Sequence, residues 1–152
     1  MERIYDTYHE SVYRLAFAYC KNRADAEDIT SEVFLKRFSV KKTFESTSHE
    51  TAWMMRVTVN LSKDLLRSFR CRFTVPLDDT VLIFETPEES EVYRAVMDLP
   101  AKYRSVIHLY YYEGYSVAEI AKIIGRSETA VQTQLYRARK LLKTALGEEL
   151  AL

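Results

Sequence analysis

The side chains best suited to chemistry lie near the C-terminus, where short polar residues precede basic ones along one predicted helix. Residues 126–143 carry five basic groups and one acid, a net charge of +4. At about 100° per residue, one side of this helix is apolar and the other is polar and basic. Short polar groups suit base edges and the basic groups that follow suit phosphates, which favours DNA binding over an ordinary solvated face. The candidate contacts are Arg126, Ser127, Glu128, Thr129, Gln132, Thr133, Tyr136, Arg137 and Lys140.

A second group lies in and before a helix predicted from about Glu50 to Phe69. By the same angular count, Trp53 falls on the polar side with Asn60, one turn from Arg56. An aromatic ring among cations suits stacking on an unpaired base. Packing of Trp53 against the first helix is an equally good interpretation. The candidate contacts are Lys41, Lys42, Phe44, Trp53, Arg56, Asn60, Lys63 and Arg67.

Other function classes find little support in the sequence. Three scattered histidines, without CxxC or HExxH, predict no metal site. The absence of an acid–base constellation, a phosphate-binding glycine loop and a nucleophile motif predicts neither an enzyme nor a cofactor. No apolar run approaches the roughly 20 residues of a membrane span, and the charged N-terminus does not resemble a signal peptide. Two cysteines cannot form a disulfide framework, so we expect a reducing, cytoplasmic location.

The elements that position these residues are all predicted to be helices. Apolar residues recur with a 3.6-residue period in the segments around 12–19, 24–38, 50–69 and 99–146. Only three glycines and three prolines interrupt the 152-residue chain. We therefore expect an all-α fold.

The segment before the C-terminal helix predicts a helix-turn-helix. Ser116 and Glu119 have the spacing of a capping box, in which each side chain bonds the other residue's amide. Gly125 is placed to end the short helix in a left-handed conformation, and Ser127 can cap the next helix. A helix, a tight glycine turn and a second helix are the layout of this DNA-binding motif.

The formal net charge of zero conceals three unlike segments. Residues 1–73 hold 13 basic and 10 acidic side chains, residues 74–93 hold six acidic and none basic, and residues 94–152 hold nine basic and six acidic. The respective charges are +3, −6 and +3. This division predicts two small helical domains, 1–73 and 94–152, joined by an acidic linker at 74–93.

The helix predicted at 24–38 is acidic on one side. Asp25, Asp28 and Glu32 follow spacings of three and four, so they share a face. Such a stripe would repel DNA but could contact a basic protein surface. Without further information, ordinary acidity near a helix N-terminus, which is favourable to the helix dipole, is the preferred interpretation.

Three segments together resemble bacterial RNA polymerase sigma factors of the sigma-70 family, in the small extracytoplasmic-function (ECF) type. Tyr13–Ala16 with residues 24–38, ADAEDITSEVFLKRF, resembles the core-binding region 2. AWMMRVTVNLSKDLLR, residues 52–67, resembles the promoter-melting helix. Residues 99–143 resemble region 4 throughout. The order and combination of these segments are far more specific than one helix-turn-helix.

The resemblance implies two DNA-binding regions and one protein-binding face. Region 4 would read the −35 element with the C-terminal helix, and residues 41–67 would read and open the −10 element. The partners would be core RNA polymerase, promoter DNA and an anti-sigma protein. Core polymerase would dock on Asp25, Asp28, Ile29, Glu32 and Val33.

Two other hypotheses remain open from the residues alone. A helix-turn-helix regulator that acts without polymerase would need only the C-terminal half of the chain. A redox-switched regulator would use Cys20 and Cys71, but these lie in different predicted elements and form no CxxC motif.

Overall fold

The computed structural model describes residues 2–69 and 87–147, and every regular element in these ranges is a helix. The predicted all-α fold is therefore confirmed for this part of the chain. The predicted linker residues 74–86 and the C-terminal residues 148–152 lie outside the described ranges. In chain order the helices are α1 (Glu2–Cys20), α2 (Arg23–Ser39), α3 (Thr47–Phe69), α4 (Pro87–Met97), α5 (Ala101–Ile107), η2 (His108–Tyr112), α6 (Val117–Ile124) and α7 (Glu128–Leu146).

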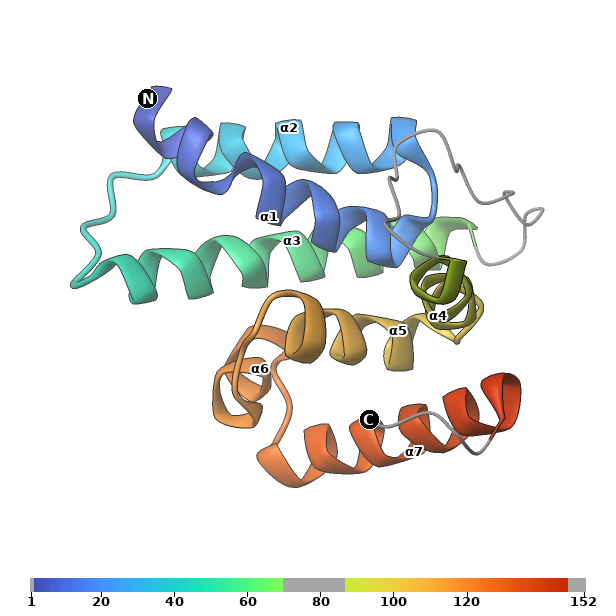
Figure 1. Ribbon diagram of the computed structural model, residues 1–152. Coiled ribbons are helices and arrows are strands. Elements are labelled where there is room, and N and C mark those ends of the chain that lie inside the picture. Colours follow the sequence, from blue (N-terminus) through green and yellow to red (C-terminus); the bar gives the residue numbers. More distant parts are fainter. Residues whose placement is uncertain (1, 70–86, 148–152) are drawn as a thin grey trace.

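Helices α1, α2 and α3 form one layer around a shared core (Figure 1). Apolar stripes on the three helices make this core, because each helix has one side to bury. The fully or nearly fully buried members include Val12, Leu15, Ala26, Val33, Met54, Met55 and Val59. This layer presents α3, with its candidate DNA contacts, toward the rest of the molecule.

Helices α4 to α7 pack as a second group. Val106, Leu109, Ile120, Leu135 and Leu142 are buried in its core. Helix α4 begins at Pro87 and packs on α7, so the C-terminal part of the predicted acidic linker is helical and belongs to this group. Proline suits the first turn of a helix, where its missing N–H costs nothing.

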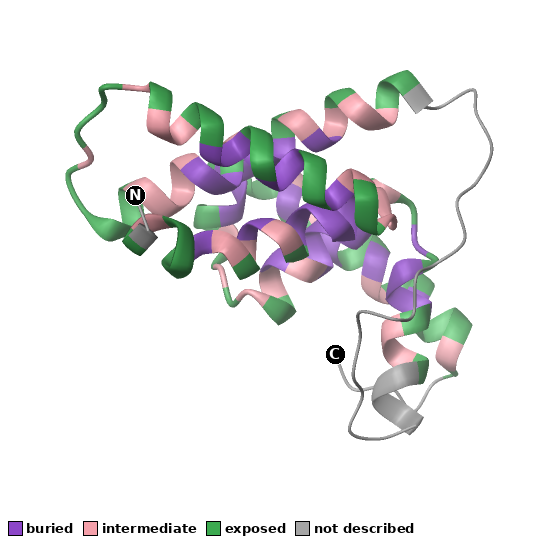
Figure 2. Ribbon diagram, turned by 90° about the horizontal axis from the view of Figure 1, so that it is seen from above, coloured by how far each residue is buried: buried purple, intermediate pink, exposed green. Residues whose placement is uncertain are grey.

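The two groups lie against each other in one body, with α3 on α6 and α1 on α5 (Figure 1). Buried residues of both groups belong to one hydrophobic core cluster, and buried segments gather in the middle of the molecule in the view from above (Figure 2). Arg104 of α5 crosses this boundary: its guanidinium donates to the Ala18 and Tyr19 carbonyls at the end of α1. It also donates to the Leu99 carbonyl at 2.7 Å.

Arg104 is only 5% exposed and has carbonyl rather than carboxylate acceptors. The last carbonyls of a helix lack intrahelical partners, so the guanidinium satisfies acceptors that would otherwise be orphaned in the boundary. Burial lowers the pKa of Arg104 to about 10, which leaves the group charged at neutral pH. We call the arrangement joined by Arg104 the closed form.

Candidate nucleic-acid interface

The helix-turn-helix forms through the local signals that predicted it. Ser116 Oγ accepts a hydrogen bond from the Glu119 amide at 3.1 Å, and Glu119 Oε1 accepts one from the Ser116 amide at 3.0 Å. Gly125 adopts the left-handed conformation, with φ of 71°. Ser127 then caps α7 by accepting from the Ala130 amide at 3.1 Å. The bonds define where α6 and α7 begin, and the left-handed Gly125 makes the turn between the two helices.

The face of α7 predicted to read DNA is open to solvent. Thr133 is half-buried, and the other eight candidate residues between Arg126 and Lys140 are exposed. Tyr136 is 64% exposed. The opposite side of α7 buries Val131 and Leu135, as expected. The buried stripe of α7 is narrow, since Leu142 is fully buried whereas the adjacent Leu141 is 42% exposed.

The candidate residues before α3 gather around one aromatic ring. The Phe44 ring lies 5.6 Å from the Trp53 ring and 5.2 Å from the His49 ring, between centroids. Lys42 Nζ stands 5.7 Å from the Phe44 centroid, and Lys41 is exposed. Trp53 is half-buried, so it packs against the core and also keeps part of its surface accessible.

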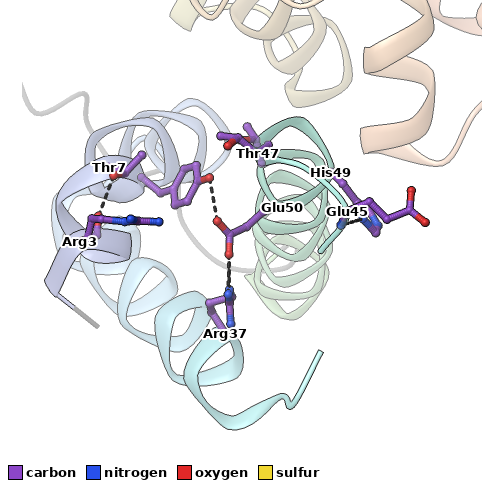
Figure 3. A network of polar contacts seen from close by, with 9 residues as sticks. Arg3, Thr7, Arg37, Glu45, Thr47, His49 and Glu50 are labelled. Atoms are coloured by element: carbon purple, nitrogen blue, oxygen red, sulfur yellow. Dashed lines mark hydrogen bonds and ion pairs between the residues drawn. The ribbon is translucent and has the colours of Figure 1, made fainter. Parts of the chain in front are cut away.

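Arg37 and Glu50 join the two ends of the loop that carries Phe44, and sequence reasoning missed both. Arg37 Nε donates to Glu50 Oε2 at 2.9 Å, and Tyr8 donates to Glu50 Oε1 at 2.9 Å (Figure 3). Burial alone would raise the pKa of Glu50, but hydrogen bonds from Arg37 and Tyr8 outweigh it and lower that pKa. No short-range spacing signals a pair 13 residues apart.

Further along α3, the candidate cations approach the helix-turn-helix. Arg56 and Asn60 are exposed, and Arg67 is exposed beside Asp64 at 3.1 Å. Arg56 Nη2 lies 3.8 Å from where a side-chain carbon on Gly125 would stand. The closed form therefore brings the candidate DNA contacts of α3 next to the turn of the helix-turn-helix.

A cleft of about 260 Å³ marks this junction. Basic side chains from both groups line it, among them Lys63, Arg67, Lys102 and Arg126. Burial, together with the guanidinium groups of Arg126 and Arg67, lowers the pKa of Lys63. The cleft thus gathers positive charge from surfaces that were each predicted to contact nucleic acid.

The acidic stripe on α2 is accessible, but its apolar neighbours are not. Asp28 and Glu32 are exposed and Asp25 is half-buried. Ile29 and Val33 are 5% and 0% exposed, so they pack in the core beneath the stripe. The sequence did not single out Leu35, which lies on the same helix and is 68% exposed.

The described residues form neither a metal site nor a membrane-spanning helix. No group of three or more histidine, cysteine, aspartate or glutamate side chains is arranged to hold a metal ion there. None of the helices described is both long and apolar enough to span a membrane.

Comparison with known proteins settles the family. Residues 4–70 match sigma-70 region 2, and residues 89–142 match sigma-70 region 4. The RNA polymerase sigma factor SigV of Bacillus subtilis is 32% identical over 145 residues, which cover 92% of this chain and 87% of SigV. The chain belongs to the sigma-70 family. The ECF sigma factor SigX of the same organism is 30% identical over 92% of this chain and 80% of its own.

Solved structures agree on the fold of this ECF sigma factor. The sigma factor RpoE of Bartonella quintana, solved with the anti-sigma factor NepR, overlays with a TM-score of 0.84 and 19% identity, covering 98% of both chains. CnrH, solved with the cytosolic domain of CnrY, gives 0.72 and 22% identity, covering 98% of this chain and 88% of its own. Family membership makes the chain a transcription initiation factor and sets aside the regulator that acts without polymerase.

Proposed function

We propose that residues 1–73 bind core RNA polymerase and open the −10 element, and that residues 94–152 read the −35 element. One observation supports this assignment of roles: each helical group has its own accessible surface suited to nucleic acid. One is the polar and basic face of α7, and the other is the aromatic and basic start of α3.

Within the −35 surface, position along α7 separates the roles. Gln132 and Thr133 lie near the N-terminal end, where a recognition helix meets base edges. Arg137 and Lys140 lie further along the helix, where they would contact phosphates of the DNA backbone. Base contacts set sequence preference, whereas phosphate contacts set affinity for any duplex. Arg126, Ser127, Glu128, Thr129 and Tyr136 complete the surface.

Within the −10 surface, Trp53 and Phe44 offer stacking partners for an unpaired base. Lys41, Lys42, Arg56 and Lys63 supply cations for the displaced strand, with Asn60 and Arg67 beside them. Base–aromatic stacking supplies about 1–3 kcal/mol per base, enough to offset the few kcal/mol of unstacking one base. The chain therefore contributes binding energy to strand opening. The core enzyme catalyses RNA synthesis, and both proteins act in the cytoplasm.

Core polymerase is the partner for the acidic stripe on α2. Asp25, Asp28 and Glu32 offer a negative, accessible face to a basic protein surface. Ile29 and Val33 support this face from beneath, because both are buried.

The closed form cannot reach both promoter elements at once. About 25 base pairs separate positions −10 and −35, which is about 85 Å of duplex at 3.4 Å per step. A compact chain of this length has a radius of gyration of about 15 Å. The segment 70–86 spans at most about 60 Å. Promoter binding therefore requires that the two groups separate, and an anti-sigma protein that grips both would oppose this.

Run-off transcription with core polymerase tests the proposal. Suitable templates are promoters of transcripts that rise when the protein is overproduced. Trp53→Ala should lower transcription strongly on duplex templates and much less on templates with a pre-melted −10 element. If core polymerase gains no activity from the protein at any such promoter, the proposal fails. Equal loss on duplex and pre-melted templates would remove the proposed role of Trp53 in opening.

A further inference from the structure

The loop between α2 and α3, residues 40–46, is tied at both ends by one partly buried ion pair. Arg37 lies in the last turn of α2 and Glu50 in the first turn of α3. Their side chains are only 15% and 16% exposed. The other ion pair described on α2, Arg23 with Glu27, is 56% and 59% exposed. Protection from water makes the Arg37–Glu50 pair the stronger constraint of the two.

Glu50 is held in place from two directions. Both of its carboxylate oxygens accept hydrogen bonds, one from Tyr8 of α1 and the other from Arg37 of α2 (Figure 3). Tyr8 is itself only 6% exposed. The carboxylate therefore fixes α3 to both other helices of its layer at the point where the loop enters α3.

Arg37 also contacts Phe44, the aromatic residue of the loop. Its guanidinium carbon lies 4.9 Å from the centroid of the Phe44 ring, within range of a cation–π contact. The Phe44 ring also lies near the Trp53 ring, at 5.6 Å between centroids, and near the His49 ring, at 5.2 Å. Phe44 thus stands between a guanidinium that is locked by Glu50 and the ring proposed to stack on a base.

We propose that Arg37 and Glu50 are positioning residues for strand capture: they hold Phe44 against Trp53 so that the Trp53 ring is set for an unpaired −10 base. This inference rests on the proposed role of Trp53. Neither residue contacts DNA in this scheme. A rigid aromatic pair loses less conformational freedom on binding a base than two independent side chains do.

Trp53 is the only tryptophan of the chain, so its fluorescence reports this arrangement directly. Arg37→Met should raise acrylamide quenching of Trp53 in the free, full-length protein, because Phe44 is released from one side. Arg37→Lys retains a charge for Glu50 but not the flat group over Phe44, so its quenching should rise too. Arg23→Met is the matched control and should leave quenching unchanged. Circular dichroism verifies that each variant keeps its helices.

A second measurement tests function: the affinity of the holoenzyme for the single-stranded non-template strand of a promoter found by the transcription experiment above. Arg37→Met should weaken this affinity about tenfold, the lower range of one base-stacking contact. Affinity for the −35 duplex should not change. Glu50→Gln, which keeps the Tyr8 acceptor and removes the ion pair, is a milder variant and should shift both readouts in the same direction.

Three outcomes overturn this inference. Quenching of Trp53 that stays at the parent value in Arg37→Met shows that the pair does not hold the loop. Increased quenching with unchanged strand affinity shows that the loop's position does not matter for capture. Full recovery of both readouts in Arg37→Lys reduces Arg37 to an ordinary ion-pair partner. If Trp53→Ala itself leaves strand affinity unchanged, the proposed role of Trp53 has failed instead.

Discussion

Replacing Arg104 with lysine should loosen the closed form without removing its charge. The guanidinium donates to the carbonyls of Ala18 and Tyr19, the latter at 2.8 Å. A lysine ammonium lacks the forked donor geometry, so we expect it to keep only one of these two bonds. One hydrogen bond to a charged group contributes about 1.5–3 kcal/mol. The open-to-closed ratio should therefore rise about 10- to 160-fold.

Cys20 is the reporter for this opening. It follows Tyr19 at the end of α1, and burial, with a contribution from Asp25, raises its pKa to about 12. When closing is faster than labelling, the rate of thiol modification is proportional to the open fraction. We expect Arg104→Lys, in a Cys71→Ser background, to accelerate Cys20 labelling by at most the factor of the opening ratio, because the half-buried thiol keeps some access to reagent in the closed form. Lysine preserves the positive charge near the thiol, so a change in the Cys20 pKa should contribute little.

The matched control is Arg139→Lys, which lies wholly within the second helical group. Arg139 Nε donates to the Tyr111 hydroxyl at 2.7 Å, so this variant also loses one arginine hydrogen bond. Its Cys20 labelling should stay within about twofold of the parent, as for other substitutions remote from the boundary. Equal acceleration in both variants would show general destabilisation rather than opening. No acceleration in Arg104→Lys would refute the role assigned to Arg104.

Further predictions concern the helix-turn-helix and the loop. Gly125→Ala must adopt φ near 71°, so it should lower the free energy of unfolding by about 1–2 kcal/mol in a denaturant titration. Gln132→Ala should change the preferred −35 sequence in a binding selection. Lys140→Ala should instead weaken binding to every duplex and reduce the salt slope by about one. Folding lowers the pKa of Glu50, so its contribution to stability should be complete above about pH 5 and fall as the pH drops through its folded pKa. In Glu50→Gln, the melting temperature should therefore fall less steeply between about pH 5 and lower pH than it does in the parent.

Local signals accounted for what the sequence predicted well. The capping box of Ser116 and Glu119 and the left-handed Gly125 depend on residues within a few positions of each other, and the structure contains both. The start of α4 at Pro87 was less evident, because an acidic segment with prolines is typical of a linker and gives little apolar periodicity.

The contacts that sequence reasoning missed join distant residues. Arg104 bonds carbonyls 85 and 86 residues away, and a backbone carbonyl leaves no trace in the sequence of its partner. The pairing of Arg37 with Glu50 could not be predicted, because a basic residue at the end of one helix and an acidic residue at the start of another are each common without a partner. For Trp53 the sequence offered two alternatives, burial or accessibility, and the half-buried ring combines both.

The positive cleft between the two groups gives salt a second effect. Dissolved ions weaken the attraction of Arg137 and Lys140 for phosphates, as in any protein that binds DNA. They also screen the repulsion between Lys63 and Arg126, which favours the closed form. The α7 face is open to solvent in the closed form, so the second effect bears only on duplexes that carry both promoter elements. The binding constant of the free chain should therefore fall more steeply with salt on a duplex that carries both elements than on the −35 element alone.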